Sequence, residues 1–125
     1  RKANFSWLRT RLSAATDYLI LPEATPNSDP SWFGFPLTLR DGERHRRVDL
    51  LRFLDSQGVG TRLLFAGNLI RQPYMQGRQF RVSGALPVTE KVMRDTFWVG
   101  VWPGLGEEQL EHIAASIESF FARIA

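Results

Sequence analysis

The apolar positions of this chain repeat with two different periods, and the changes of period divide it into helices and strands. Apolar residues recur at three- and four-residue intervals near the start, which predicts a helix over residues 1–15. The same spacing predicts helices over 44–57 and 107–124, and Gly58 follows the first of these as a stop signal. A shorter helix is expected over 87–95, because proline is well tolerated in the first turn of a helix.

Three other segments have the composition of strands. Residues 32–39 are rich in aromatic side chains, 59–65 form an apolar run that predicts a buried strand, and 96–102 is bounded by a Pro-Gly pair. Pro36 is expected at an edge or bulge, since it has no N–H for a ladder. Residues 66–86 form a long irregular connection, and such loops are often functional.

The order of these elements predicts an α+β fold. Strands separated by helices favour a two-layer domain, with about three mainly antiparallel strands and helices packed on one face. The chain has 125 residues, which predicts a single domain over 1–125. No apolar run approaches the roughly 20 residues that a membrane span needs, so no membrane association is expected.

Net charge limits the kinds of partner, and the cysteine and histidine content limits the kinds of metal or disulfide site. The net charge of +3 favours an anionic partner, but the excess is too small to make nucleic acid the expected one. The sequence contains no cysteine, so neither a disulfide nor a thiolate metal site is possible within it. No histidine stands at a trusted metal-ligand spacing, and no metal site is predicted.

The most informative chemistry follows the apolar run 59–65. Asn68, Arg71, Gln72 and Tyr74 supply hydrogen-bond donors and acceptors within seven residues, which suits a sugar or nucleotide but also suits loop capping. Arg62 has the fork geometry for a phosphate or carboxylate, and a strand-end salt bridge is the alternative.

A second candidate surface lies in the aromatic strand. Phe33 and Phe35 could stack on a planar or sugar ligand or could simply fill the core, and Gly34 would allow a close backbone approach. Glu90 and Asp95 are interpreted as solvated helix charges. The residues alone therefore predict a small domain with one polar loop ready for a ligand and no catalytic residue of its own.

Several motifs resemble the C-terminal segment of the DegT/DnrJ/EryC1/StrS sugar aminotransferases, which are fold-type I pyridoxal-phosphate enzymes. The resemblance covers almost the whole chain, and its motifs are residues 58–73, 86–87 and 101–105. It implies that the chain is the C-terminal small domain of a longer enzyme, cut from it at the N-terminus. Residues 1–15 would be part of the helix that leads in from the missing large domain.

Within that family, segments 31–36, 65–69 and 71–74 are similar to the 3-dehydrase branch, which includes CDP-4-keto-6-deoxyglucose 3-dehydrase of lipopolysaccharide synthesis. The ordinary aminotransferases have a Pro-x-Pro-Leu-His run where this chain has residues 66–70, and tend to have His and Leu in place of Phe33-Gly34. These departures favour a 3-dehydrase over an aminotransferase.

The resemblance implies a cytoplasmic homodimer that uses pyridoxamine phosphate, or pyridoxal phosphate, as an electron sink when the 3-hydroxyl of a 4-keto sugar nucleotide leaves. Such an activity is of the lyase or oxidoreductase type. A histidine replaces the Schiff-base lysine in this branch, and CDP-sugar members add a two-iron two-sulfur cluster and a separate reductase. The base, the cofactor anchors and the cluster ligands would all lie in the large domain.

For this chain, the resemblance implies a substrate-binding role. Asn68, Arg71 and Tyr74, with Gln72, would line the side that faces the nucleotide sugar, and Arg62 would lie near a phosphate. Phe33 and Phe35 would form one wall of the active-site cleft.

Four alternatives remain. The chain could be the small domain of an aminotransferase, a stand-alone basic binding module, or a dimerisation piece without ligand contact. If the chain is part of such an enzyme, Arg71 and Gln72 could also form contacts between the subunits of a dimer instead of binding substrate.

Overall fold

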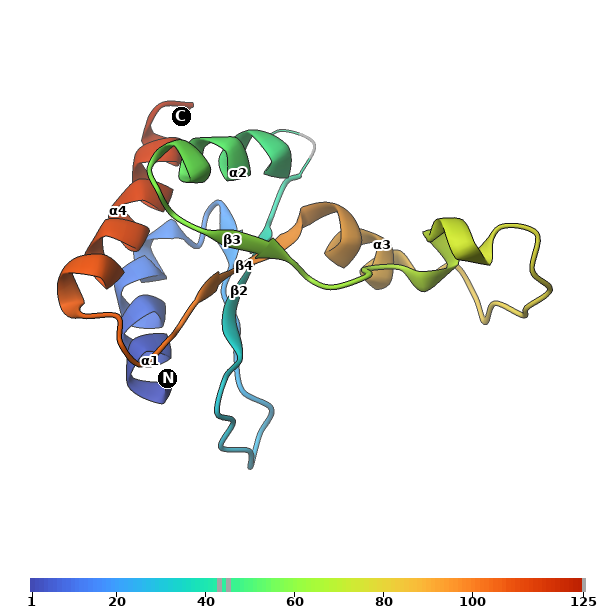
Figure 1. Ribbon diagram of the computed structural model, residues 1–125, viewed down its shortest axis with the longest axis horizontal. Helices are drawn as coiled ribbons and strands as arrows, with labels where there is room; N and C mark the ends of the chain where they lie inside the picture. Colours follow the sequence, from blue (N-terminus) through green and yellow to red (C-terminus); the bar gives the residue numbers. More distant parts are fainter. Residues whose placement is uncertain (43, 45, 125) are drawn as a thin grey trace.

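A computed structural model describes residues 1–42, 44 and 46–124, and its elements follow the predicted order (Figure 1). The helices are α1 (Lys2–Arg11), α2 (Arg47–Ser56), α3 (Pro87–Asp95) and α4 (Glu107–Ala122). The strands are β1 (Leu19–Ile20), β2 (Gly34–Leu39), β3 (Thr61–Leu63) and β4 (Thr96–Gly100), and 3-10 turns cover Leu12–Ala15, Leu69–Arg71 and Pro73–Met75. The helix predicted over 44–57 therefore begins at Arg47, and residue 45 lies outside the described part.

The four strands form one antiparallel sheet in the order β1-β2-β4-β3. This confirms the α+β class, with one strand more than the three expected. The additional strand is β1, which has only two residues and pairs with Thr38 and Leu39. Because β1 stops there, β2 has a free edge beside Pro36, as its missing N–H requires.

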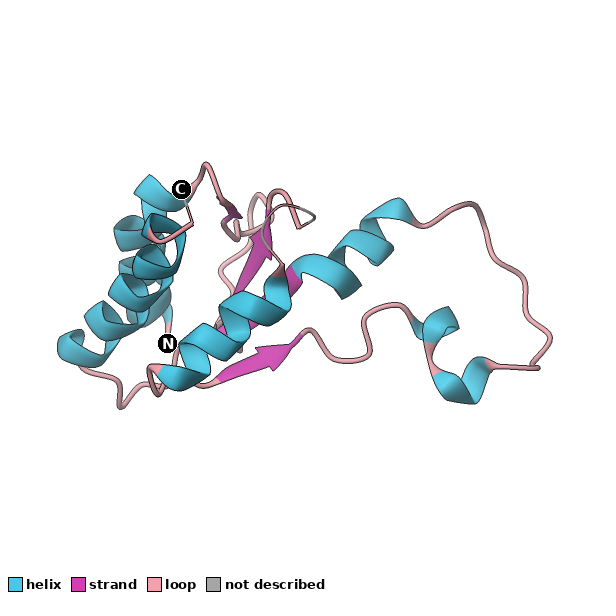
Figure 2. Ribbon diagram, turned by 90° about the horizontal axis from the view of Figure 1, so that it is seen from above, coloured by secondary structure: helices cyan, strands magenta, loops and turns pink. Residues whose placement is uncertain are grey.

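One face of the sheet carries the core. Phe35, Leu37 and Leu39 of β2 alternate with less buried residues, and Phe97 and Val99 of β4 do the same, so that all five lie on one face and are fully buried. Helices α1, α2 and α4 cover this face and add their own buried apolar residues to a single cluster (Figure 2). Helix α3 adds none of its apolar side chains to that cluster.

Gly58 ends α2 as the sequence predicts. Its φ of +74° is a left-handed conformation that glycine adopts without strain. Its N–H donates to the Asp55 carbonyl at 2.9 Å, and the Val59 N–H donates to the Leu54 carbonyl at 2.9 Å. This pair of bonds satisfies the free carbonyls at the end of the helix and turns the chain into β3.

The strand predicted over 59–65 is shorter and more exposed than expected. Regular pairing covers only Thr61–Leu63, and Leu63 is 49% exposed. The reason is the position of β3 at the edge of the sheet, next to β4 alone. The expectation of a buried strand at this point was wrong, because an apolar run does not reveal which strand lies at an edge.

Residues 64–86 form an arm that extends away from the body, beyond α3 (Figures 1 and 2). Asn68 is its only buried residue among those described. Gly67 fixes the base of the arm: its φ is +60°, and a Cβ there would lie 2.7 Å from Cγ of Met93 on α3. No helix in the described ranges is both long enough and apolar enough to cross a membrane.

Candidate functional site

The predicted site residues do not form one cluster. The arm contains Asn68, Arg71, Gln72 and Tyr74. Glu90 of α3 joins the first two of these by accepting a hydrogen bond from each. Phe33 and Arg62 lie at the sheet, on or beside the face that the helices leave open, whereas Phe35 lies in the core and is fully buried. Phe35 therefore offers no surface to a ligand in this structure.

Glu90 of α3 organises the start of the arm. Its Oε1 accepts hydrogen bonds from Asn68 Nδ2 at 2.5 Å and from Arg71 Nε at 2.8 Å. The hydrogen bond from Arg71 is the main reason that the pKa of Glu90 lies below its ordinary value, and the Asn68 amide adds to the effect. Glu90 was expected to be a solvated helix charge, but it holds two residues of the predicted site.

The Asn68 amide is occupied at both ends. Its Oδ1 accepts from the N–H of Ile70 at 3.2 Å, so the side chain also caps the first 3-10 turn of the arm, and it is only 2% exposed. Arg71, by contrast, is 62% exposed and uses only its Nε in the described contacts. Of this pair, only Arg71 has N–H groups available to an external anion.

Gln72 and Tyr74 have different surroundings. The Gln72 Nε2 donates to the carbonyl of Ala66 at 2.6 Å, which closes the first part of the arm on itself. The Tyr74 side chain is 56% exposed, and its backbone carbonyl accepts from Arg78 Nε at 2.7 Å. Tyr74 thus presents a ring and a hydroxyl to solvent on a turn held in place by its own backbone.

An aromatic cluster of Phe33, Phe65 and Trp98 lies on the open face of the sheet. The rings of Phe33 and Trp98 have centroids 5.1 Å apart, and those of Phe33 and Phe65 are 6.3 Å apart with 28° between their planes. Phe33 is 66% exposed and Phe65 is 77% exposed. The sequence pattern points to Phe33 but not to Phe65 or Trp98, because the three residues are far apart in the chain.

Gly34 is small for a reason other than the one expected. A Cβ at this position would lie 2.3 Å from Cε3 of Trp98, so the indole occupies the space over the glycine. The Trp98 Nε1 also donates to the Leu63 carbonyl at 3.2 Å, which fixes the orientation of the ring. Gly34 allows an aromatic side chain of this chain, rather than a ligand, to approach the backbone.

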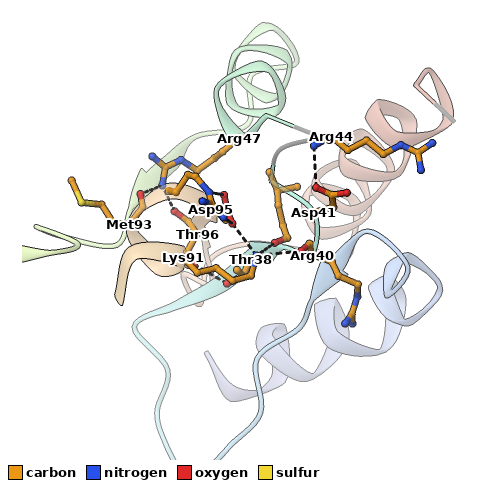
Figure 3. Close-up of polar contacts among 11 residues, drawn as sticks. Thr38, Arg40, Asp41, Arg44, Arg47, Lys91, Met93, Asp95 and Thr96 are labelled. Atoms are coloured by element: carbon orange, nitrogen blue, oxygen red, sulfur yellow. Dashed lines mark hydrogen bonds and ion pairs between the residues drawn. The ribbon is translucent and has the colours of Figure 1, made fainter. Parts of the chain in front are cut away.

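Asp95, at the end of α3, is the centre of a second polar cluster (Figure 3). It is 1% exposed and is paired with Lys91 Nζ at 2.8 Å and with Arg94 Nε at 2.9 Å. Burial alone would raise its pKa, but the hydrogen bonds from Arg94 and Lys91 outweigh burial and leave the pKa lowered. The expectation of a solvated charge was wrong here, and Gly42 shows how tightly the carboxylate is enclosed, since a Cβ there would lie 2.0 Å from Oδ1.

The same cluster fastens α3 to the sheet and to α2. Arg47 Nη1 donates to the carbonyls of Met93 at 2.6 Å and Thr96 at 2.8 Å, which satisfies free carbonyls at the end of α3 (Figure 3). Lys91 Nζ donates to the Leu39 carbonyl at 2.9 Å. These contacts hold the helix that carries Glu90, and therefore the arm, in a fixed position.

The residues of this chain do not fit the covalent anchoring of pyridoxal phosphate. A Schiff base needs a neutral, accessible lysine amine. The chain has two lysines, of which Lys2 is paired with Asp29 and Lys91 is held by two carbonyls and Asp95. Among the described residues, no group of three or more His, Cys, Asp or Glu side chains could hold a metal ion.

A hollow of about 680 Å³ in the surface contains none of the predicted site residues. It lies between segment 58–60 and α4 and is bordered by Trp102 and His112. His112 Nε2 is hydrogen-bonded to the Gln57 carbonyl at 2.8 Å, and this contact ties α4 to the end of α2.

Comparison with known sequences gives a consistent family match. The pattern of the DegT/DnrJ/EryC1/StrS aminotransferase family matches residues 1–118. The lipopolysaccharide biosynthesis protein RfbH of Salmonella typhimurium is 54% identical over 121 residues, which are 97% of this chain and 28% of RfbH. The dTDP-4-dehydro-2,6-dideoxy-D-glucose 3-dehydratase of Saccharopolyspora spinosa is 42% identical over 123 residues, which are 98% of this chain and 26% of that protein.

Solved structures share the fold. An aminotransferase from Psychrobacter cryohalolentis matches with a TM-score of 0.84 at 18% identity, over 98% of this chain and 34% of that one. The E. coli GDP-4-keto-6-deoxy-D-mannose-3-dehydratase with bound hydrated PLP matches with a TM-score of 0.82 at 18% identity, over 93% of this chain and 29% of that one. The chain thus spans about a quarter to a third of the length of these proteins.

Proposed function

This chain belongs to the DegT/DnrJ/EryC1/StrS aminotransferase family, and from that premise we propose that it is the small domain of a nucleotide-sugar 3-dehydrase. The whole enzyme would use pyridoxamine phosphate to remove the C3 hydroxyl of a 4-keto-6-deoxy sugar nucleotide in lipopolysaccharide sugar synthesis. The observation that carries the proposal is the 54% identity to RfbH over almost the whole chain. The 42% identity to a protein named as a sugar 3-dehydratase supports the same branch.

The proposed role of this chain is to bind and orient the sugar nucleotide. Arg71 and Arg62 are exposed cations suited to the diphosphate, and Tyr74 offers an exposed ring and hydroxyl. Asn68 and Gln72 would act through the shape of the arm, because their side-chain amides are already hydrogen-bonded within it. Phe33 would wall the cleft, while Phe35 supports it from the core.

We propose that the cofactor and the acid-base groups are held outside this chain, because neither of its lysines is suited to a Schiff base. Pyridoxamine phosphate would supply the electron sink for loss of the hydroxyl. An iron-sulfur cluster, a separate reductase, a homodimeric assembly and a cytoplasmic location belong to the same proposal for the whole enzyme.

A second candidate is the small domain of a sugar aminotransferase. Solved structures of aminotransferases share this fold as closely as the 3-dehydratases do, with TM-scores of 0.84 and 0.82 for the examples given. Fold likeness at 18% identity therefore does not separate the two activities.

The product distinguishes the two candidates. The full-length protein should be incubated with a 4-keto-6-deoxy sugar nucleotide, pyridoxamine phosphate and the separate reductase with its electron donor, because loss of the C3 oxygen is a two-electron reduction. A second incubation should contain pyridoxal phosphate and glutamate instead. We expect mass spectrometry to show a product that has lost its C3 oxygen. A 4-amino sugar with its C3 hydroxyl intact would instead establish the aminotransferase. The isolated 125 residues should not convert the sugar nucleotide in either incubation. Conversion by them would contradict the assignment of the chemistry to another domain.

A further inference from the structure

Phe65 combines two features that are unfavourable in isolation. Its φ of +48° lies in the left-handed region, where a bulky L-residue is strained by roughly 1–2 kcal/mol. Its side chain is also 77% exposed, so burial within this chain does not compensate for the strain. Strained backbone persists where the surroundings impose it, and such residues concentrate at functional sites.

The strained residue presents its ring next to another exposed ring. Phe33 and Phe65 are stacked with 28° between their planes, and Phe33 in turn lies against Trp98. A shallow pocket of about 170 Å³ opens between these three side chains and Pro36. The three rings form one continuous aromatic surface, which we call the aromatic platform (Phe33, Phe65 and Trp98).

The platform is rigid at its base. The Trp98 indole lies directly over the backbone of Gly34 and is oriented by its hydrogen bond to the Leu63 carbonyl. Trp98 is partly buried, while the outer rings of Phe33 and Phe65 remain open to solvent. A fixed aromatic surface loses little conformational freedom when a flat ligand stacks on it.

A cation lies beside the platform. Arg62 is the cross-strand partner of Trp98 in the β3–β4 pairing, so the two side chains project from the same face of the sheet. Within the described ranges, Arg62 makes one hydrogen bond, from Nη1 to the carbonyl of Thr61 at 2.9 Å. Its other N–H groups are therefore available to an anion.

We propose that the aromatic platform binds the base of a nucleoside diphosphate by stacking, with Arg62 directed toward the phosphates. Flat rings beside a guanidinium match a ligand that is aromatic at one end and anionic at the other. The proposal deepens the proposed function by assigning the nucleotide part of the substrate to Phe65 and Trp98. It rests on that function for the nucleotide itself.

The test measures the affinity of the full-length protein for CDP, GDP and dTDP, and for inorganic pyrophosphate, by calorimetry. Phe65→Leu and Phe33→Leu keep an apolar side chain but remove the aromatic ring. We expect each to weaken the best nucleoside diphosphate by about tenfold or more while pyrophosphate affinity stays the same. Arg62→Gln should weaken both ligands, because it removes the charge that they share.

Two further variants separate ligand binding from stability. Phe80 is another exposed phenylalanine, in the arm and 46% exposed, and Phe80→Leu should leave nucleotide affinity unchanged. Phe65→Gly removes the aromatic ring, so it should lose nucleotide affinity. It also relieves the left-handed strain, so it should not lower the thermal midpoint of unfolding.

Three results would overturn the inference, and they are distinguishable. If the wild-type protein bound none of the three nucleotides, the inference and the proposed substrate class would both fall. Should it bind one that Phe65→Leu and Phe33→Leu bind equally well, only the platform would be wrong. If Phe65→Leu and Phe33→Leu lowered the thermal midpoint of unfolding while nucleotide affinity stayed unchanged, the rest of the full-length protein would cover this face of the sheet.

Discussion

The two faces of the sheet have the same strands but opposite characters. On the covered face, Phe35, Phe97 and Val99 are fully buried beneath α1, α2 and α4. On the open face, Trp98 is partly buried and Phe33, just before β2, is 66% exposed. Successive residues of a strand point to opposite faces, so one short segment serves both. The difference teaches that aromatic residues one position apart can have unrelated roles, one in stability and one in recognition.

The strongest way to break this comparison is to make the same substitution on each face. Phe97→Ala should lower the free energy of unfolding by about 3–5 kcal/mol, because it opens a cavity in a fully buried site. Phe33→Ala should lower it by less than about 1 kcal/mol, since its ring is already largely in water. Urea denaturation of the two variants measures both values, and equal losses would contradict the separation of roles.

The buried carboxylate of Asp95 gives the next largest effect. Asp95→Asn should cost about 1–3 kcal/mol, because the charge that orders Lys91 and Arg94 is removed from a site that is 1% exposed. Asp55→Asn, on the exposed side of α2, is the matched control and should change stability by less than about 0.5 kcal/mol.

The contribution of the Asp95 charge to stability also depends on pH. The pKa of Asp95 is lowered in the folded chain, so its contribution is present above the unfolded pKa of about 4 and is lost as pH falls through the folded value. The stability of the wild type should therefore approach that of Asp95→Asn as the pH is lowered below about 4. A constant difference down to pH 2 would show that Asp95 acts by packing rather than by charge.

The arm offers the smallest and most local effect. Gly67→Ala introduces a Cβ that lies 2.7 Å from Met93 Cγ, in addition to the strain of a φ of +60°. Gly77→Ala has similar strain, with a φ of +74°, but nothing lies within 4 Å of its Cβ. We expect Gly67→Ala to increase proteolytic cleavage within 66–86 more than Gly77→Ala does. Equal cleavage would mean that contact with α3 does not fix the arm.

Much of the fold could be predicted from local pattern. The apolar stripe over 107–124 and the glycine after α2 define α4 and the end of α2 almost as the structure has them. Strand β1 could not be predicted, because two residues carry no periodicity and are held only by pairing with β2. The exposure of β3 likewise depends on strand order, which the sequence does not state.

The candidate site was only partly accessible from the sequence. The cluster 68–74 was identified because its polar residues are adjacent, but their partner Glu90 lies 19 residues beyond Arg71. Phe65 and Trp98 were missed because they meet Phe33 only after the sheet has formed. Contacts between distant segments are decided by topology, and composition alone does not locate them.

The assignment to the 3-dehydrase branch has one direct chemical test. Full-length protein should be saturated with pyridoxal phosphate, reduced with borohydride and digested, and the peptides examined by mass spectrometry for a covalent cofactor adduct. The account predicts cofactor that binds but leaves no lysine-linked adduct, because the branch is expected to have histidine in place of the Schiff-base lysine. A lysine-linked adduct would contradict the account and establish a sugar aminotransferase.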